Sequence, residues 1–533
     1  MKQKLNEERM KELKEKMKTV LSLATNDPLT ELDLVDKIQR LGVAYHFEAE
    51  IEAALQRIYD NDINYFINQD IVDDDCAYLH IVALRFRLLI QAGYYVSPDV
   101  FNKFKDEKDE FKSNLRSDTK CMLSFYEASH LGFNGEDIMD EATTFTTNYL
   151  KSILQRIQYS PLATEVESAL KIPLQKSIDR VQARHYISIY QADESRNESL
   201  LEFAKLDFNM VQQVHRKEIS EILRWWKAID FKSKLPYEIR DRVVEAYCQI
   251  MACYFEPQFT SGRILLTKLY LMTSTLDDTF DVYGNLEELA PLVDAFQRWD
   301  VRDVKDLAEH MKIIFLQLAN ILDEAQEVMT TPAQQIGISY LKQEMKTYTK
   351  GLLEEAKVLL FQGEVPTLED WLPIAEVTIA INTWIIGAVL DMGDSGMKEI
   401  LDWIVSKPKI IKYSAILCRL FDDIASFEFE HKRGITLSSV SICMKHEGLS
   451  ESEAIEKIQK RIISLWKDMG QECLRPNPVP MRVLQIVLNL QRIMEMYYGV
   501  KDDGYSVSTA NIGKGIDAKS APNFPACKFS CKS

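Results

Sequence analysis

The sequence predicts an all-α protein built from two helical domains, and three observations support this prediction. Apolar residues recur at three- and four-residue spacing in segments such as 48–59 and 453–466, which is the pattern of an amphipathic helix. Strand-like alternation is scarce, and only 19 glycines and 16 prolines are present. The length of 533 residues exceeds what one hydrophobic core usually organises, so two domains are expected.

The composition along the chain places the domain junction near residue 205. All seven tryptophans lie at or beyond Trp225, and a polar stretch at 191–199 precedes an apolar run that begins at Leu200. We therefore expect an N-terminal domain over 1–205 and a C-terminal domain over 206–505. The last segment, 506–533, is rich in Ser, Lys, Gly, Asn and Pro and lacks a helical stripe, so a disordered tail is predicted there.

Charge and cysteine usage narrow the class of protein. The chain carries 64 basic and 81 acidic side chains, a net charge of −17, which disfavours a nucleic-acid partner. Nine cysteines without a CxxC pair favour reduced thiols. The longest apolar stretch, 379–390, is too short for a membrane span, and the mixed-charge N-terminal segment, with Glu7, Glu8, Glu12 and Glu15, lacks the features of a signal or transit peptide. We therefore expect a cytoplasmic, monomeric enzyme that acts on a small molecule without a membrane partner.

The first candidate site is the acidic motif DDTFD at 277–281, which follows the apolar helical run 265–276. On a regular helix Asp277 and Asp281 share one face, with their carboxylates about 6 Å apart along the axis. Like charges this close repel unless solvent or a cation lies between them, and Mg²⁺ prefers carboxylate oxygens. The motif, which includes Asp278, predicts a metal site at the mouth of a pocket. A solvated acidic patch is the alternative.

The second candidate site is the acidic motif DDIASFEFE at 422–430. Asp422, Ser426 and Glu430 recur every four residues and form one stripe about 12 Å long. A short carboxylate, a hydroxyl and a longer carboxylate can converge on one cation if Glu430 reaches back toward the N-terminus. Asp423 lies off this stripe and is expected to orient or solvate its neighbours.

Arginines accompany both motifs. Arg419 lies one helical turn before Asp422, where it can form a salt bridge or meet a diphosphate in a bidentate fork. Arg240 and Arg242 follow Leu235-Pro236, whose proline suits the entry to a helix. Two basic residues at an exposed helix start are ordinary. Together with two carboxylate motifs, however, they are expected to hold a leaving diphosphate.

These features, in this order, resemble the plant terpene synthase family, and specifically its sesquiterpene synthases. The resemblance runs from about Asp36 to Tyr505. The segments that carry it include RWWKAIDF (224–231), RDRVVEAY (240–247), YFEPQ (254–258), DDTFDVYG (277–284), DAFQRWD (294–300) and DDIASFEFEHKRG (422–434).

The resemblance implies an N-terminal α-barrel-like domain and a C-terminal domain with the class I terpenoid synthase fold. The N-terminal domain needs a DxDD motif for protonation-initiated chemistry, and none occurs here, so this domain is expected to be structural. The implied cofactor of the C-terminal domain is Mg²⁺, as three ions for which Mn²⁺ can substitute. Carried onto matching positions, the implied metal ligands are Asp277, Asp278, Asp281, Asp422, Ser426 and Glu430.

The resemblance also implies how a prenyl diphosphate substrate is held. The residues that would bind it are Arg240, Asp277, Asp281, Arg419 and Asp422, and the arginines Arg240, Arg242 and Arg419 would draw off the diphosphate. Tyr498, Asp503 and Tyr505 would cap the pocket and assist proton transfer. Trp384 is a candidate wall residue that could stabilise a carbocation, although a plain place in the helix core accounts for it equally well.

The implied activity is that of a sesquiterpene synthase, which ionises and cyclises farnesyl diphosphate and releases diphosphate. A monoterpene synthase that uses geranyl diphosphate remains an alternative. So does a catalytically impaired homologue that binds a prenyl diphosphate, because the chain ends depart from the family pattern. A chain-elongating prenyltransferase is disfavoured, because Ser426 and Glu430 replace a second aspartate-rich motif. Gln249 stands where many relatives carry a tryptophan, so the product skeleton is left open.

Overall fold

The computed structural model describes residues 2–25, 27–61, 74–157, 160–360, 365–393, 396–432 and 437–498, apart from a few side chains within helices. Helices dominate these residues, and their one β-type pairing is an isolated bridge between Lys105 and Phe111. The prediction of an all-α protein is confirmed. The tail predicted at 506–533 lies outside the described residues.

The chain divides into two compact units. Among the described residues, the first comprises those up to Gln212 together with the segment Gly470–Asn477, and the second comprises Gln213–Met469 and the residues from Pro478 to Tyr498. The division falls inside one long helix, α10 (Glu198–Ile229), which also contains the junction predicted near residue 205.

The first unit consists of helices around two apolar clusters, one built mainly by α1–α3 and the other mainly by α5–α7. Asp27 and Asp74 begin α2 and α5, because their carboxylates accept backbone N–H groups of the first turn. The segment Gly470–Asn477 returns to this unit, where the Arg475 N–H donates to the Gly93 carbonyl at 2.7 Å. The helices are α1 (Lys2–Ala24), α2 (Pro28–Arg40), α3 (Glu48–Asp60), α5 (Asp75–Gln91), α6 (Thr119–Ser129), α7 (Asp137–Ile153), α8 (Pro161–Lys171) and α9 (Asp179–Ala192).

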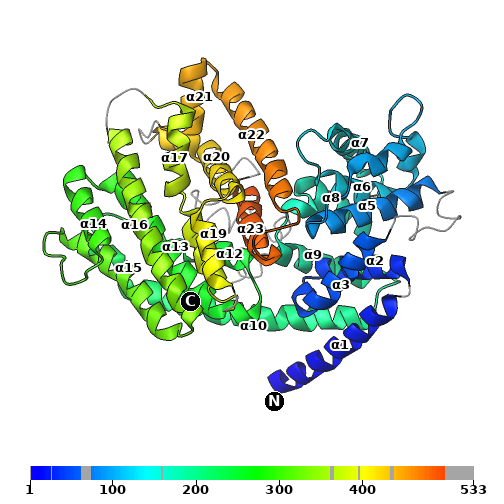
Figure 1. The fold of residues 1–533 in the computed structure, drawn as a ribbon, viewed down its shortest axis with the longest axis horizontal. Helices are drawn as coiled ribbons and strands as arrows, with labels where there is room; N and C mark the ends of the chain where they lie inside the picture. The colour runs from blue at the N-terminus through cyan, green and yellow to red at the C-terminus, as the bar shows by residue number, and fades with distance from the viewer. Residues whose placement is uncertain are drawn as a thin grey trace. The chain divides into compact units, whose positions relative to one another are not determined.

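The second unit is a helical bundle, most of whose helices are labelled in Figure 1. Helix α18 packs against both α13 and α20, the two helices that carry the acidic motifs. Helix α16 packs against α14, α15, α17 and α18, and α23 packs against α12 and α20. The helices are α11 (Phe231–Lys234), α12 (Val243–Cys253), α13 (Thr260–Asp278), α14 (Leu286–Arg298), α15 (Glu309–Val328), α16 (Pro332–Leu360), α17 (Leu368–Thr378), α18 (Ile381–Val389), α19 (Met397–Val405), α20 (Lys409–Lys432), α21 (Ser439–Glu447), α22 (Glu451–Glu472) and α23 (Met481–Tyr498).

One stretch, Leu368–Val389, is long and apolar enough to cross a membrane by length and composition alone. Most of it is buried inside the protein, as in the core helices of many globular proteins. It is also interrupted, because α17 ends at Thr378 and Ala380 adopts a left-handed conformation with φ +57° before α18 begins. This stretch is therefore weak evidence for a membrane span.

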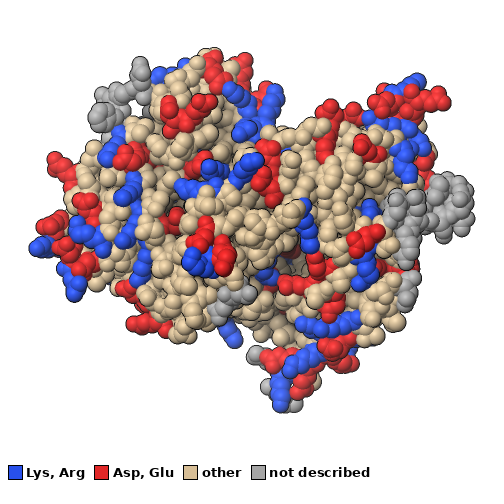
Figure 2. All heavy atoms as spheres, in the orientation of Figure 1, with Lys and Arg blue, Asp and Glu red and all other residues tan. Residues whose placement is uncertain are grey.

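Charged side chains of both signs are interspersed on the face drawn in Figure 2. Ion pairs at the surface form within one helix or one turn, such as Lys398 with Asp402 and Arg302 with Asp300. Exposed pairs of this kind contribute little to stability. The mixed surface agrees with the absence of a Lys/Arg-rich block in the sequence.

Candidate active site

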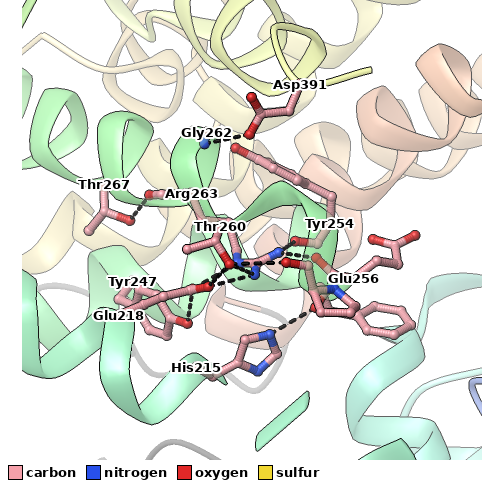
Figure 3. Close-up of polar contacts among 12 residues, drawn as sticks. His215, Glu218, Tyr247, Tyr254, Glu256, Thr260, Gly262, Arg263, Thr267 and Asp391 are labelled. Carbon is pink, nitrogen blue, oxygen red and sulfur yellow. Dashed lines mark hydrogen bonds and ion pairs between the residues drawn. The ribbon is translucent and has the colours of Figure 1, made fainter. Parts of the chain in front are cut away.

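The start of α13 is held by a buried polar network, shown in Figure 3. The Arg263 guanidinium donates to both carboxylate oxygens of Glu218 on α10, at 2.9 and 2.7 Å, and to the Glu256 carbonyl at 2.7 Å. The Tyr247 hydroxyl of α12 donates to Glu218 at 2.7 Å. A bidentate ion pair whose other donors are also bonded is the geometry that makes its burial tolerable. One end of α13 is thereby fixed, and the other end carries the first acidic motif.

The first acidic motif straddles the end of α13. The helix is followed by a π-helical turn, Thr279–Tyr283, in which the Gly284 N–H donates to the Thr279 carbonyl at 2.7 Å. A Cβ at position 284 would lie 2.8 Å from that carbonyl, so glycine is required for this close approach. The structure differs here from the regular helix expected through the motif. Asp281 lies in this wider turn and is exposed. Burial raises the pKa of the Tyr348 hydroxyl of α16, and both Asp277 and Asp281 lie close enough to Tyr348 to raise it further.

Asp277 lies where several carboxylates converge. Its pKa is raised to about 7, because burial disfavours the charged form and because Glu355, Asp278 and Asp422 repel the charge. The Arg419 guanidinium acts in the opposite direction. Since Asp422 belongs to the second motif, the two motifs face each other closely enough to interact electrostatically. This excess of negative charge favours the binding of a cation.

Arg419 on α20 bridges groups from three helices. Its guanidinium lies 3.8 Å from the Glu355 carboxylate of α16 and 3.8 Å from the Asp422 carboxylate, and it donates to the Thr378 hydroxyl of α17 at 3.0 Å. Burial lowers the pKa of Arg419, but the carboxylates of Glu355, Asp423 and Asp422 outweigh burial and raise the pKa above its usual range. Arg419 therefore forms the salt bridge with Asp422 that the sequence allowed. Both of its ion pairs are long, at 3.8 Å, so a phosphate oxygen could replace either carboxylate as the partner of the guanidinium.

The stripe predicted for the second motif lies on one continuous helix, α20. Asp422 accepts a hydrogen bond from the Tyr498 hydroxyl of α23 at 3.2 Å. Ser426 is buried, and its hydroxyl has no hydrogen-bond partner among the residues that the structure describes. A buried hydroxyl without a partner costs free energy, so a ligand at this position would be stabilising.

Asp423 points away from the stripe, as the sequence predicts. Its carboxylate accepts the backbone N–H of Ser439 at 2.6 Å, at the start of α21. This contact holds the start of α21 against α20, and Asp423 also lies close enough to Arg419 to raise the pKa of that guanidinium. The side chain of Glu430 and the whole of Asp503 and Tyr505 lie outside the described residues.

Arg240 joins the first motif directly. Its guanidinium donates to the Asp278 carboxylate at 2.6 Å. Arg242 is buried and immediately precedes α12. The structure thus places Arg240 at the first motif and Arg419 at the second, so an anion between the motifs would meet a guanidinium from each side.

Glu355 is a site residue that sequence reasoning missed. It lies on the buried face of α16, together with Tyr348 and Leu352, and its carboxylate is close enough to Asp277 to raise the pKa of that residue. The sequence could have indicated this role, because Glu355 is an acidic residue that shares a helix face with Tyr348 and Leu352, four and three residues apart. Thr378, the hydroxyl partner of Arg419, carries no comparable signal, because its role depends on where α17 ends.

An aromatic pair lies on the same face of α13 as Asp277. Tyr270 precedes Asp277 by two helical turns, about 10 Å along the axis. Its ring lies 4.7 Å from the ring of Trp384 on α18, and Trp384 is buried. Both readings of Trp384 stay open, because a core residue and a wall residue would both pack in this way.

The residues of the two motifs fit a divalent metal. No group of three or more His, Cys, Asp and Glu side chains forms a complete metal site within the described ranges. Mg²⁺ does not require one, because it is typically bound by one or two carboxylates, with waters and phosphate oxygens as the other ligands. The raised pKa of Asp277 and the unpartnered hydroxyl of Ser426 are the features that such ions would relieve.

Comparison with known proteins covers both units. Residues 227–468 match the terpene synthase family, metal binding domain, and residues 1–170 match the terpene synthase, N-terminal domain. A (−)-germacrene D synthase of Vitis vinifera is 45% identical over 497 residues, which are 93% of this chain and 87% of that protein. A (+)-delta-cadinene synthase isozyme of Gossypium arboreum is 42% identical over 500 residues, which are 94% of this chain and 88% of that protein.

A similar solved structure is the isoprene synthase of grey poplar leaves (Populus x canescens) in complex with three Mg²⁺ ions and dimethylallyl-S-thiolodiphosphate. The two chains superpose with a TM-score of 0.83 at 33% sequence identity. The likeness covers 93% of each chain, so it extends over both compact units.

Proposed function

Because the chain belongs to the terpene synthase family, we propose that it is a sesquiterpene synthase, which ionises and cyclises farnesyl diphosphate and releases diphosphate. The predicted resemblance and the class I terpenoid synthase fold are both confirmed. The observation that carries the proposal is that Glu355 and Asp422, each 3.8 Å from the Arg419 guanidinium, also lie close enough to Asp277 of the first motif to raise its pKa. That proximity supports a single site between the motifs, where a diphosphate and its metal ions would balance the carboxylates.

The proposed site depends on a divalent metal. The residues that would hold it are Asp277, Asp278 and Asp281 on one side and Asp422, Ser426 and Glu430 on the other. When bound, Mg²⁺ neutralises the diphosphate and makes it a better leaving group. Three Mg²⁺ ions, replaceable by Mn²⁺, are the number we propose, in line with the three ions of the isoprene synthase complex.

The arginines would exchange partners when substrate binds. Arg240 would leave Asp278 and Arg419 would loosen from Glu355 and Asp422, and their guanidinium groups would then meet phosphate oxygens. A developing negative charge on the leaving diphosphate is stabilised by donors that are already oriented toward it. Arg242, buried at the start of α12, would support the same end of the diphosphate.

The aromatic pair would protect the carbocation that remains. The rings of Tyr270 and Trp384 exclude water from their face, and an aromatic face attracts a cation. Tyr498 bonds to Asp422 and is placed to cap the site, together with Asp503 and Tyr505. We propose that residues 1–205 serve as a structural domain and 206–505 as the catalytic domain, with 506–533 as a tail. A monomeric state and a cytoplasmic location remain predictions.

The test is product formation by the purified full-length chain. Incubation with farnesyl diphosphate and Mg²⁺ should release volatile sesquiterpenes, measured by gas chromatography with mass spectrometry, and chelation of the metal should abolish them. The variant that combines Asp277→Asn with Asp281→Asn should lose turnover, whereas Asp300→Asn, at an exposed aspartate outside both motifs, should retain it. A folded protein that forms no product from farnesyl diphosphate would overturn the proposal.

Two further measurements distinguish a sesquiterpene synthase from a monoterpene synthase and from a catalytically impaired homologue. A larger kcat/KM with geranyl than with farnesyl diphosphate would indicate a monoterpene synthase. Binding of Mg²⁺ and inorganic pyrophosphate without turnover of either substrate would indicate a catalytically impaired homologue.

A further inference from the structure

The segment 235–242 carries Arg240 and Arg242, and it contacts the π-helical turn Thr279–Tyr283 through an aromatic stack. The Tyr237 ring lies 4.2 Å from the Tyr283 ring, and the two planes differ by only 3°. Tyr283 is the last residue of the turn that follows the aspartates. The stack therefore joins the arginine-bearing segment to the aspartate-bearing turn at a point that neither motif includes.

Each tyrosine hydroxyl also bonds to the other's segment. The Thr279 hydroxyl donates to the Thr275 carbonyl at 2.7 Å, so it accepts from the Tyr237 hydroxyl, which lies at 2.9 Å. The Tyr283 hydroxyl donates to the Glu238 carbonyl over a longer distance of 3.5 Å. These reciprocal bonds fix the orientation of both rings, which stacking alone would leave free to slide.

A third ring supports Tyr237 from its other side. The His310 ring of α15 meets the Tyr237 ring edge-on, with centroids 6.1 Å apart and planes at 86°. His310 in turn lies 3.9 Å from the Glu288 carboxylate of α14. Tyr237 is thus held between the π-helical turn and two helices, whereas Tyr283 keeps 40% of its surface exposed.

This attachment matters because substrate binding must break a second contact between the two segments, the pair of Arg240 with Asp278. Arg240, three residues after Tyr237, donates a hydrogen bond to the Asp278 carboxylate. If Arg240 is to bind diphosphate, it must release Asp278, and the segment then loses an ion pair that holds it to α13. The tyrosine stack does not involve a charged group, so it persists through that exchange.

We propose that Tyr237 and Tyr283 form a latch that positions Arg240 and Arg242 over the aspartate-bearing turn while Arg240 changes partner from Asp278 to the diphosphate. Tyr237 is a positioning residue, because its contacts are to the turn and to α15. The identity of the anion as a prenyl diphosphate rests on the proposed function. The attachment of the segment to the turn does not, and it can be measured in the protein without substrate.

Limited trypsin digestion tests the latch directly, because the segment contains the cleavable bonds that follow Arg240 and Arg242. In the full-length protein, Tyr237→Ala should raise the rate of first cleavage at these bonds about tenfold, measured by mass spectrometry, since loss of an aromatic pair and a hydrogen bond favours local opening. Tyr283→Ala, at the more exposed partner, should have a similar effect. Tyr237→Phe keeps the stack and should stay within about threefold of the unsubstituted protein. Tyr340→Ala, a tyrosine on α16 that bonds to Asp402, is the matched control and should leave these bonds protected.

A second measurement asks whether the latch serves anion binding. The affinity for inorganic pyrophosphate with Mg²⁺, measured by calorimetry, should fall about tenfold in Tyr237→Ala and recover in Tyr237→Phe. In the active enzyme the same variant should raise KM for farnesyl diphosphate more than it lowers kcat. A folded Tyr237→Ala protein with unchanged cleavage at both bonds would overturn the latch. Increased cleavage with unchanged pyrophosphate affinity would overturn its positioning role. Failure to form a terpene product would instead count against the proposed function, because neither cleavage nor pyrophosphate binding requires turnover.

Discussion

The two acidic motifs hold their charges in different ways. The first lies at the end of α13, where the helix widens into a π turn, Asp281 is exposed and Arg240 is about one-third exposed. The second lies within α20, where Ser426 is buried and the Arg419 side chain is only 13% exposed. The partly exposed Arg240 guanidinium can be solvated when its ion pair opens, whereas the buried Arg419 guanidinium depends on protein partners. The first motif is therefore suited to exchange partners, and the second to keep a fixed frame.

The largest expected effect is the difference in stability between variants that lack Arg419 and variants that lack Arg240. Arg419→Ala leaves Glu355 and Asp422 without the guanidinium between them, which should lower the free energy of unfolding by about 3 kcal/mol. Arg240→Ala removes a more exposed pair and should cost about 1 kcal/mol or less. Both should lower kcat by on the order of 100-fold if both guanidinium groups meet the diphosphate. Urea unfolding and steady-state kinetics on the same preparations give the two numbers. Equal losses of stability would remove the distinction between the motifs.

Metal binding should stabilise the protein only while both motifs are intact. With Mg²⁺ and inorganic pyrophosphate at about 100 times their dissociation constant, the free energy of unfolding should rise by about 2.7 kcal/mol. Asp277→Asn and Asp422→Asn should each abolish most of this gain, measured as the shift in Tm between chelator and metal. Without metal, Asp277→Asn should be at least as stable as the unsubstituted protein, since it removes a repelled charge. A metal-dependent shift that survives in either variant would contradict a shared site.

Variants of Asp423 should show that this residue stabilises the second motif without binding the metal. Asp423→Ala loses the acceptor for the Ser439 N–H and should lower the free energy of unfolding by about 1 kcal/mol. Asp423→Asn keeps an acceptor and should cost less. Both variants should retain the Tm shift with Mg²⁺ and pyrophosphate that Asp422→Asn loses. Loss of that shift in Asp423→Asn would place Asp423 among the metal ligands.

The smallest effect concerns the break between α17 and α18, which places Thr378 beside Arg419. Ala380 adopts φ +57°, a conformation that costs roughly 1 kcal/mol for a residue with a Cβ and little for glycine. Ala380→Gly should therefore raise the free energy of unfolding by up to about 1 kcal/mol without changing kcat. A decrease in stability would show that the backbone relaxes elsewhere and that the break is not strained at this residue.

Part of the site could be read from the sequence because it depends on local spacing. Asp422 and Ser426 lie on one helix because α20 is uninterrupted around them, and Asp423 is turned aside by the same periodicity. The first motif was harder to predict, because a π turn depends on how Gly284 closes onto the Thr279 carbonyl. Glu355 was missed for a related reason, since its importance comes from Asp277 and Arg419, which are distant in sequence.

By itself the sequence determined that the protein is helical, that it carries two acidic motifs, and which family it resembles. These properties follow from periodicity and from short motifs, in which each residue acts on neighbours within a few positions. Only the tertiary structure decided that Asp422 lies close enough to Asp277 to raise its pKa, that Arg419 bridges Glu355 and Thr378, and that Gly470–Asn477 returns to the first unit. Such contacts join residues far apart in the chain, and they form because buried charges and apolar faces must find partners that no local pattern specifies.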